Sequence, residues 1–115
     1  MKPPAAIAAA AARLRRWLFD DALPLWWRSG ADPVGGYHDR LALDGRPLIG
    51  RKRARVQARQ VVSYHQAGAM GWRGPWREAA NHGFAHLERA HRRPDGLYRA
   101  WTGAGTGDPP DGDGV

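Results

Sequence analysis

The 115-residue sequence contains no cysteine, which excludes a disulfide scaffold, a cysteine-ligated zinc site and a thiol nucleophile. It also lacks an apolar run of about 20 residues, which excludes a membrane-spanning helix. The N-terminal stretch MKPPAAIAAAAARLRRW has no leucine-rich core leading to a cleavage site. We therefore expect a helix there rather than a secretory signal, and a cytoplasmic protein. No glycine-rich loop of the P-loop or dinucleotide-binding type is present, and we expect no cofactor.

Lysine is scarce, because sixteen of the 18 basic residues are arginine. Residues 1–60 hold twelve basic and five acidic residues, whereas the remainder holds six of each, so the net charge of +7 lies in the first half. Such a field can attract nucleic acid, an anionic membrane or a phosphorylated small molecule. A small basic nucleic-acid-binding protein is therefore one alternative, although abundant arginine, alanine and glycine are also typical of GC-rich coding sequence.

Hydrophobic spacing predicts three helices, over residues 5–28, 52–70 and 75–93. The first begins with the alanine run and is expected to be disturbed near Pro24. The second mixes arginine and glutamine with valine and tyrosine on every side. This composition indicates either a poor surface helix or a helix that lines a polar cavity.

The segments between and after these helices contain turn signals. Asp44-Gly45 separates GYHDRLAL from RPLI, which predicts a β-hairpin between the first two helices. The stretch PDGLYRAW predicts a turn and a short strand, and the glycine-, proline- and aspartate-rich residues 102–115 predict a disordered tail. Connections of this length are unusual in a self-contained bundle, so we expect residues 1–101 to be part of something larger.

Two segments carry a family resemblance. WWRSGADPVGGYHDRLALDGRPL contains a Gly-Gly-aromatic hairpin with Asp-Gly at its tip, and RKRARVQARQVVSYHQAGAMGW follows it, with R-x-R-V-Q-A-R-Q starting at Arg53. Together with ANHGFAHLERAHRRPDGLY they resemble the N-acylglucosamine 2-epimerase superfamily, which includes sugar 2-epimerases, mannose isomerases and mannose-6-phosphate isomerase-like proteins. The resemblance spans roughly residues 12–101, and the ungapped RVQARQ match in register with the hairpin is its most specific part.

The resemblance implies an all-α fold: the N-terminal part of an (α/α)6 barrel, with three helices and a β-hairpin between the first and second. It implies a sugar 2-epimerase or aldose–ketose isomerase that transfers a proton through an enediolate and needs no metal. The substrate would be a monosaccharide or disaccharide, and the full-length protein would be a possible homodimer. On this interpretation residues 1–101 are the N-terminal portion of the barrel, inactive alone. A degenerate, non-catalytic remnant is a further alternative.

The same resemblance suggests which residues meet the sugar. Arg55 would contact sugar oxygens, because the forked donors of a guanidinium suit two adjacent oxygens where enediolate charge develops. Its supporting residues would be Gln57, Arg59 and Gln60, and His38 would point into the mouth of the funnel. The family's two catalytic histidines come from later helices, so no catalytic residue is assigned here.

Less specific alternatives stay open for each of these residues. Arg55 could be an exposed or ion-paired helix residue, Arg59 could form a structural ion pair, and His38 could be solvated on its strand. His82 and His86 share a helix face, as zinc-binding pairs do, but no glutamate follows the first of them as in the H-E-x-x-H motif, so no metal site is predicted.

Overall fold

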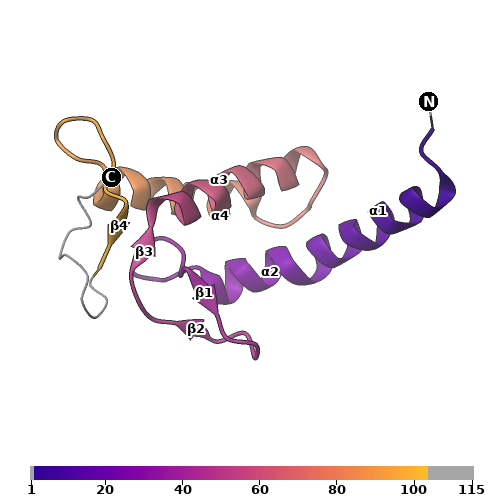
Figure 1. Cartoon of the computed structure of the whole chain (residues 1–115), viewed down its shortest axis with the longest axis horizontal. Coiled ribbons are helices and arrows are strands. Elements are labelled where there is room, and N and C mark those ends of the chain that lie inside the picture. The colour runs from indigo at the N-terminus through magenta and orange to yellow at the C-terminus, as the bar shows by residue number, and fades with distance from the viewer. Residues whose placement is uncertain (1, 104–115) are drawn as a thin grey trace.

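The first helical stretch runs continuously over residues 5–30 in the computed structural model, which describes residues 2–103 (Figure 1). It comprises α1 (Ala5–Trp17), a π-helical turn (Leu18–Ala22), α2 (Leu23–Leu25) and a second π-helical turn (Trp26–Gly30). Alanine favours the first part, and the disturbance expected at Pro24 takes the form of wider turns on both sides of it. The stretch therefore ends two residues later than predicted, at Gly30.

The predicted hairpin between the first two helices is confirmed, with short strands. β1 (Arg40–Leu41) pairs antiparallel with β2 (Pro47–Leu48). At the tip, Gly45 has a φ of 89°, a value that glycine adopts readily, and the carboxylate of Asp44 accepts a hydrogen bond from the Arg46 main chain.

The second helix begins later than predicted. Lys52 and Arg53 form a strand, β3 (Lys52–Arg53), which pairs antiparallel with β4 (Trp101–Thr102), and α3 follows over Ala54–Ala69. The pairing takes up the main-chain groups that would otherwise start the helix, and the Ala54 N–H donates to the Ala100 carbonyl. Thr102, the first residue of the predicted tail, is thus part of a strand. Residues 104–115, the rest of that tail, lie outside the described residues.

The third helix, α4 (Trp76–His86), continues as a π-helical turn (Leu87–His91) and packs along α3. Glycines allow the close approach: a Cβ added to Gly68 would lie 2.3 Å from the Trp76 ring, and one added to Gly83 would lie 3.0 Å from Val61. The buried core lies between these helices and the end of the first one, and it consists of Leu23, Tyr37, Tyr64, Ala67, Trp72, Ala79 and Ala80.

The same loop follows the first and third helices. Pro33, Gly35 and Tyr37 recur as Pro94, Gly96 and Tyr98, in a P-x-G-x-Y pattern. In both loops a β-bridge closes the turn, Ala31 to Tyr37 in one and Arg92 to Tyr98 in the other. Four main-chain hydrogen bonds, those of the bridge included, correspond between the two loops. Each loop brings the chain back to the start of α3, where the ion pair Arg53–Asp39 and the β3–β4 pairing meet.

The molecule leaves large surfaces uncovered. In Figure 1, α1 projects away from the other helices, and it contains no buried residue. The side chain of Trp17, at the end of α1, is 57% exposed. Within residues 2–103, none of the helices combines the length and the apolar character needed to cross a membrane.

Candidate functional site

The helix α3 presents one face to the core and leaves another open. Gln57, Tyr64 and Ala67 are buried, whereas Arg55, Arg59 and Val62 are exposed. The open face is partly apolar, because the Val62 side chain is 54% exposed and lies beside Ala58. A shallow depression of about 360 Å³ on this face is lined by Ala58, Arg59, Val62 and Ser63. We call this surface, with Arg55, the open face of α3.

Arg55 lies beside two further depressions at the start of α3. One, of about 460 Å³, is lined by Arg51, Arg53, Ala54, Arg55, Ala100 and Trp101. The other, of about 270 Å³, is lined by Ala54, Arg55, Ala58, Leu87 and Tyr98. Arg55, like Ala54, therefore lines both of these depressions.

The two arginines of the open face differ from the basic residues just before them. Lys52 Nζ lies 2.6 Å from Asp32 Oδ2, and Arg53 Nε lies 2.7 Å from Asp39 Oδ2. Neither Arg55 nor Arg59 has a carboxylate partner among residues 2–103. The alternative of a structural ion pair is thus not found for either residue within that part of the chain, and both guanidinium groups face solvent.

Gln57 requires a correction, because its side chain is inside the protein and does not reach the open face. It is 0% exposed, its Oε1 accepts a hydrogen bond from the Tyr37 N–H, and its Nε2 donates to the Tyr37 carbonyl, both at 2.8 Å. The amide therefore satisfies two buried main-chain groups of the loop over residues 31–37, which we call the glycine loop. Gln60 is half-buried and lines none of the depressions described above.

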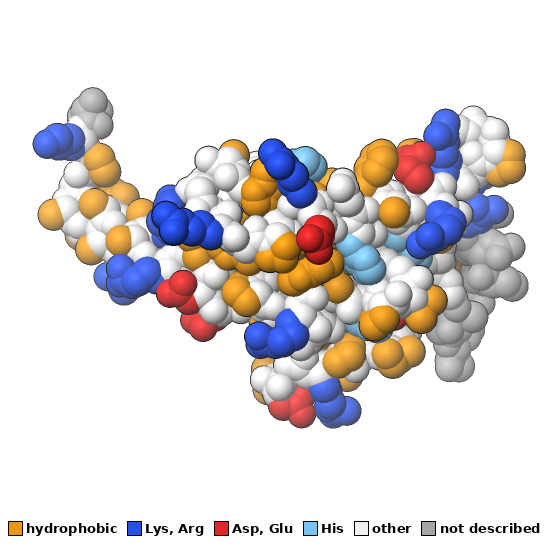
Figure 2. Space-filling model, turned by 180° about the vertical axis from the view of Figure 1, so that it is seen from behind, with side chains coloured by type: hydrophobic (Ala, Val, Ile, Leu, Met, Phe, Trp, Pro, Cys, Tyr) orange, Lys and Arg blue, Asp and Glu red, His pale blue; other side chains and the backbone are white. Residues whose placement is uncertain are grey.

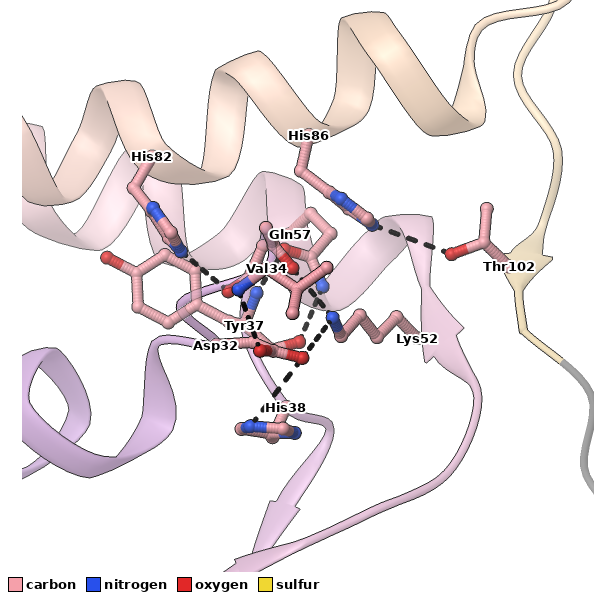
Figure 3. A network of polar contacts seen from close by, with 11 residues as sticks. Asp32, Val34, Tyr37, His38, Lys52, Gln57, His82, His86 and Thr102 are labelled. Atoms are coloured by element: carbon pink, nitrogen blue, oxygen red, sulfur yellow. Dashed lines mark hydrogen bonds and ion pairs between the residues drawn. The ribbon is translucent and has the colours of Figure 1, made fainter.

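His38 is found in neither of its two predicted environments. It is not solvated on its strand, and it does not line any of the depressions described above. Its side chain is buried, with Nε2 3.9 Å from Asp32 Oδ2, and Asp32 in turn binds Lys52 (Figure 3). Burial tends to raise the pKa of Asp32, but hydrogen bonds from Lys52 and the Val34 N–H hold that pKa below its ordinary value. The carboxylate therefore stays ionised and holds the loop against β3.

Three histidines of the third helix line the other side of this network. His82 Nε2 donates to the Gly36 carbonyl at 2.8 Å, and His86 Nε2 lies 3.5 Å from Thr102 Oγ1 (Figure 3). The His86 and His91 rings meet edge to face at 5.0 Å. Burial, with the neighbouring His91, Lys52, Arg89 and His82, lowers the pKa of His86 to about 4. Within residues 2–103 no three metal-binding side chains converge on one point.

The lowered pKa of His86 predicts that acid destabilises this chain. In the folded state the imidazole stays neutral down to about pH 4, whereas an unfolded chain takes up a proton near pH 6.5. The free energy of unfolding should therefore fall by on the order of 2 kcal/mol as pH drops from about 6.5 to about 4. Urea denaturation across this range should give a shallower slope for His86→Gln. The exposed His65→Gln should leave the slope unchanged, and equal slopes for all three proteins would contradict this assignment.

Comparisons with known proteins agree on one family. Residues 35–112 match the N-acylglucosamine 2-epimerase (GlcNAc 2-epimerase) family. The chain is 41% identical over 95 residues to a mannose-6-phosphate isomerase of Rhizobium meliloti (strain 1021). The aligned region covers 82% of this chain and 24% of the relative.

Solved structures show the same fold. A D-mannose isomerase aligns with a TM-score of 0.70 at 19% identity, over 81% of this chain and 24% of that one. The cellobiose 2-epimerase from Spirochaeta thermophila DSM 6192 aligns with a TM-score of 0.71 at 21% identity, over 87% and 26%. The three helices thus correspond to part of an (α/α)6 barrel, and the chain spans about a quarter of the length of these proteins.

Proposed function

Because the chain belongs to the N-acylglucosamine 2-epimerase family, we propose that it supplies the N-terminal part of a carbohydrate isomerase or 2-epimerase. The observation that carries this proposal is the open face of α3. Two arginines without a carboxylate partner within residues 2–103 lie there on a partly apolar surface that no other described element covers. In a complete barrel this face would border the sugar.

The chemistry explains why arginine suits this position. Moving a proton at the carbon beside a sugar carbonyl builds negative charge on two adjacent oxygens of an enediolate. A guanidinium keeps its charge at every working pH and offers paired donors to two such oxygens. Arg55 would contact the sugar in this way, and Arg59, one helical turn further along the open face, would support it. The proton-transferring acid and base would come from the parts of the barrel beyond this chain.

The names of the relatives indicate the substrate class. Two of the three proteins act on mannose or its 6-phosphate by name, and the third on cellobiose. We therefore place an aldose, with mannose or a mannose derivative first, at the site. On the face seen in Figure 2, lysine and arginine side chains form separate patches between neutral and apolar surface, so this face does not favour the nucleic-acid alternative.

A chimera tests this proposal. The 95 residues that align with the R. meliloti isomerase would replace their counterparts in that protein, and turnover of mannose 6-phosphate would be measured. We expect the chimera to be active, and the 115-residue chain alone to be inactive. Saturating sugar should also slow modification of Arg55 by an arginine-selective dicarbonyl reagent, read by mass spectrometry, while Arg13 on the projecting α1 reacts equally with and without sugar. An active isolated chain, or an active chimera whose Arg55 gains no protection, would refute the proposal.

A further inference from the structure

The chain contains one structural unit twice. Residues 23–41, the first unit, correspond to residues 84–102, the second unit, at a constant offset of 61 positions that relates Pro33 to Pro94. The π-helical turn Trp26–Gly30 corresponds to the π-helical turn Leu87–His91, and β1 corresponds to β4. The repeated loop lies between the turn and the strand in both units. The repeat therefore extends from the sequence to the main chain, and the two units can be compared position by position.

The helix α3 covers one side of the first unit. The Gln57 amide bonds to both main-chain groups of Tyr37. Tyr64, two turns further along α3, stacks on the Tyr37 ring at 5.9 Å and donates a hydrogen bond to the Leu23 carbonyl. Leu23 and Tyr37 are both buried. One helix thus buries this side of the unit through an amide and an aromatic side chain.

The same side of the second unit is open. Phe84 corresponds to the buried Leu23 and is 54% exposed. Tyr98 corresponds to the buried Tyr37 and is 46% exposed, and its neighbour Leu97 is exposed as well. Within the described part of the chain, the main-chain N–H and C=O of Tyr98 have no hydrogen-bond partner, whereas in the first unit the α3 amide binds these two groups. In Figure 1 the loop of the second unit projects from the end of the molecule that carries β4.

A mostly apolar depression lies between the second unit and the start of α3. Its volume is about 270 Å³, and its wall consists of Leu87 and Tyr98 on one side and of Ala54, Arg55 and Ala58 on the other. Ala54 and Ala58 lie one turn apart, so their small side chains allow a further helix to come close to α3. Arg55 is the one charged residue of this wall. The depression therefore suits the apolar face of a helix.

We propose that Phe84, Leu97 and Tyr98 form a docking surface for an α-helix that repeats the role of α3. The docked helix would present a side-chain amide to the Tyr98 main chain and, two turns later, an aromatic side chain to the Tyr98 ring. The relatives, of which this chain spans about a quarter, have the length to supply such a helix. The docking surface rests on the internal repeat and not on a sugar substrate, although the docked helix would lie beside Arg55.

Amide hydrogen exchange tests this docking surface in the chimera described above, built so that the transplanted segment runs through Thr102. In the 115-residue chain the Tyr98 N–H should exchange rapidly, whereas the Tyr37 N–H, which donates to Gln57, should be protected. In the chimera the Tyr98 N–H should exchange on the order of 100-fold more slowly, because a helix of the R. meliloti isomerase would cover it. Tyr37 serves as the internal control and should be protected in both proteins.

A charge placed on the docking surface gives a second measurement. Leu97→Asp should leave the urea midpoint of the 115-residue chain unchanged, because this side chain is exposed there. The same substitution should lower the midpoint of the chimera, because the docked helix would bury the new carboxylate without a partner. Val34→Asp is the matched control, since Val34 is an exposed residue in the loop of the first unit, and it should change neither midpoint.

Rapid exchange at Tyr98 in the chimera would overturn the docking surface, as would the lack of a cooperative urea transition in the chimera or an equal effect of Leu97→Asp on both proteins. Exchange at Tyr98 that slows as the concentration of the 115-residue chain rises would identify a second copy as the occupant, and would also overturn the proposal. An inactive chimera with a protected Tyr98 would support the docking surface and remove the proposed enzyme function. An active chimera with rapid exchange at Tyr98 would do the reverse.

Discussion

Gly36→Ala is expected to lower the free energy of unfolding by about 3 kcal/mol or more. Gly36 has a φ of 73°, and an added Cβ would lie 2.6 Å from His86 Cδ2 and 2.9 Å from Gln57 Oε1. An alanine would therefore be strained in its backbone and would also push apart the two side chains that enclose the glycine loop. Neither neighbour can yield easily, because both are buried.

Gly96→Ala separates the two contributions. Gly96 has a φ of 86°, close to that of Gly36, but an added Cβ would meet nothing within 4 Å. This variant should lose only the backbone term, about 1 kcal/mol. Urea denaturation of the 115-residue chain, followed by far-ultraviolet circular dichroism, measures both variants. Equal losses would show that the glycine loop is not packed against α4 as described.

Local signals in the sequence are sufficient to predict the helices and the hairpin. The alanine run, the apolar spacing and the Asp44-Gly45 turn each act within a few residues, so they predict elements without knowledge of the tertiary fold. The RVQARQ segment also indicates the protein family, which the comparisons support independently. Residues 52 and 53 could not be placed in this way, because their strand pairs with a partner about 50 residues further along the chain.

The sequence contains a signal from which the repeated loop can be predicted. The P-x-G-x-Y pattern at Pro33 and at Pro94 is a spacing that a search for internal repeats can detect. Its consequence, that two loops return the chain to the start of α3, depends on main-chain hydrogen bonds that the pattern does not encode. The burial of His38 follows from the same loop and could not be read from strand alternation.

The candidate site shows why a motif alone can mispredict the role of a residue. The sequence motif predicts one shared function for Arg55, Gln57 and Arg59, because all three residues belong to it. On a helix, residues two apart do not share a face, whereas residues four apart do. Gln57 consequently faces the core and holds Tyr37, while Arg55 and Arg59 remain together on the open face. Helical periodicity within the motif would have separated the structural residue from the two outward ones.

The second large effect concerns activity. In the chimera, Arg55→Gln should lower kcat/KM for the sugar by about 100-fold, the loss typical of removing one donor that stabilises developing negative charge. Stability should not change, since Arg55 is exposed and makes no ion pair within residues 2–103. Arg13→Gln carries the same charge change on α1 and should keep the kcat/KM of the parent chimera.

The most direct test of the account is therefore a paired measurement of kcat/KM and of the urea midpoint for Arg55→Gln in the chimera. The account predicts a fall in kcat/KM of about 100-fold at an unchanged midpoint. An unchanged kcat/KM, or a fall that is matched by a loss of stability, would contradict a sugar contact by Arg55.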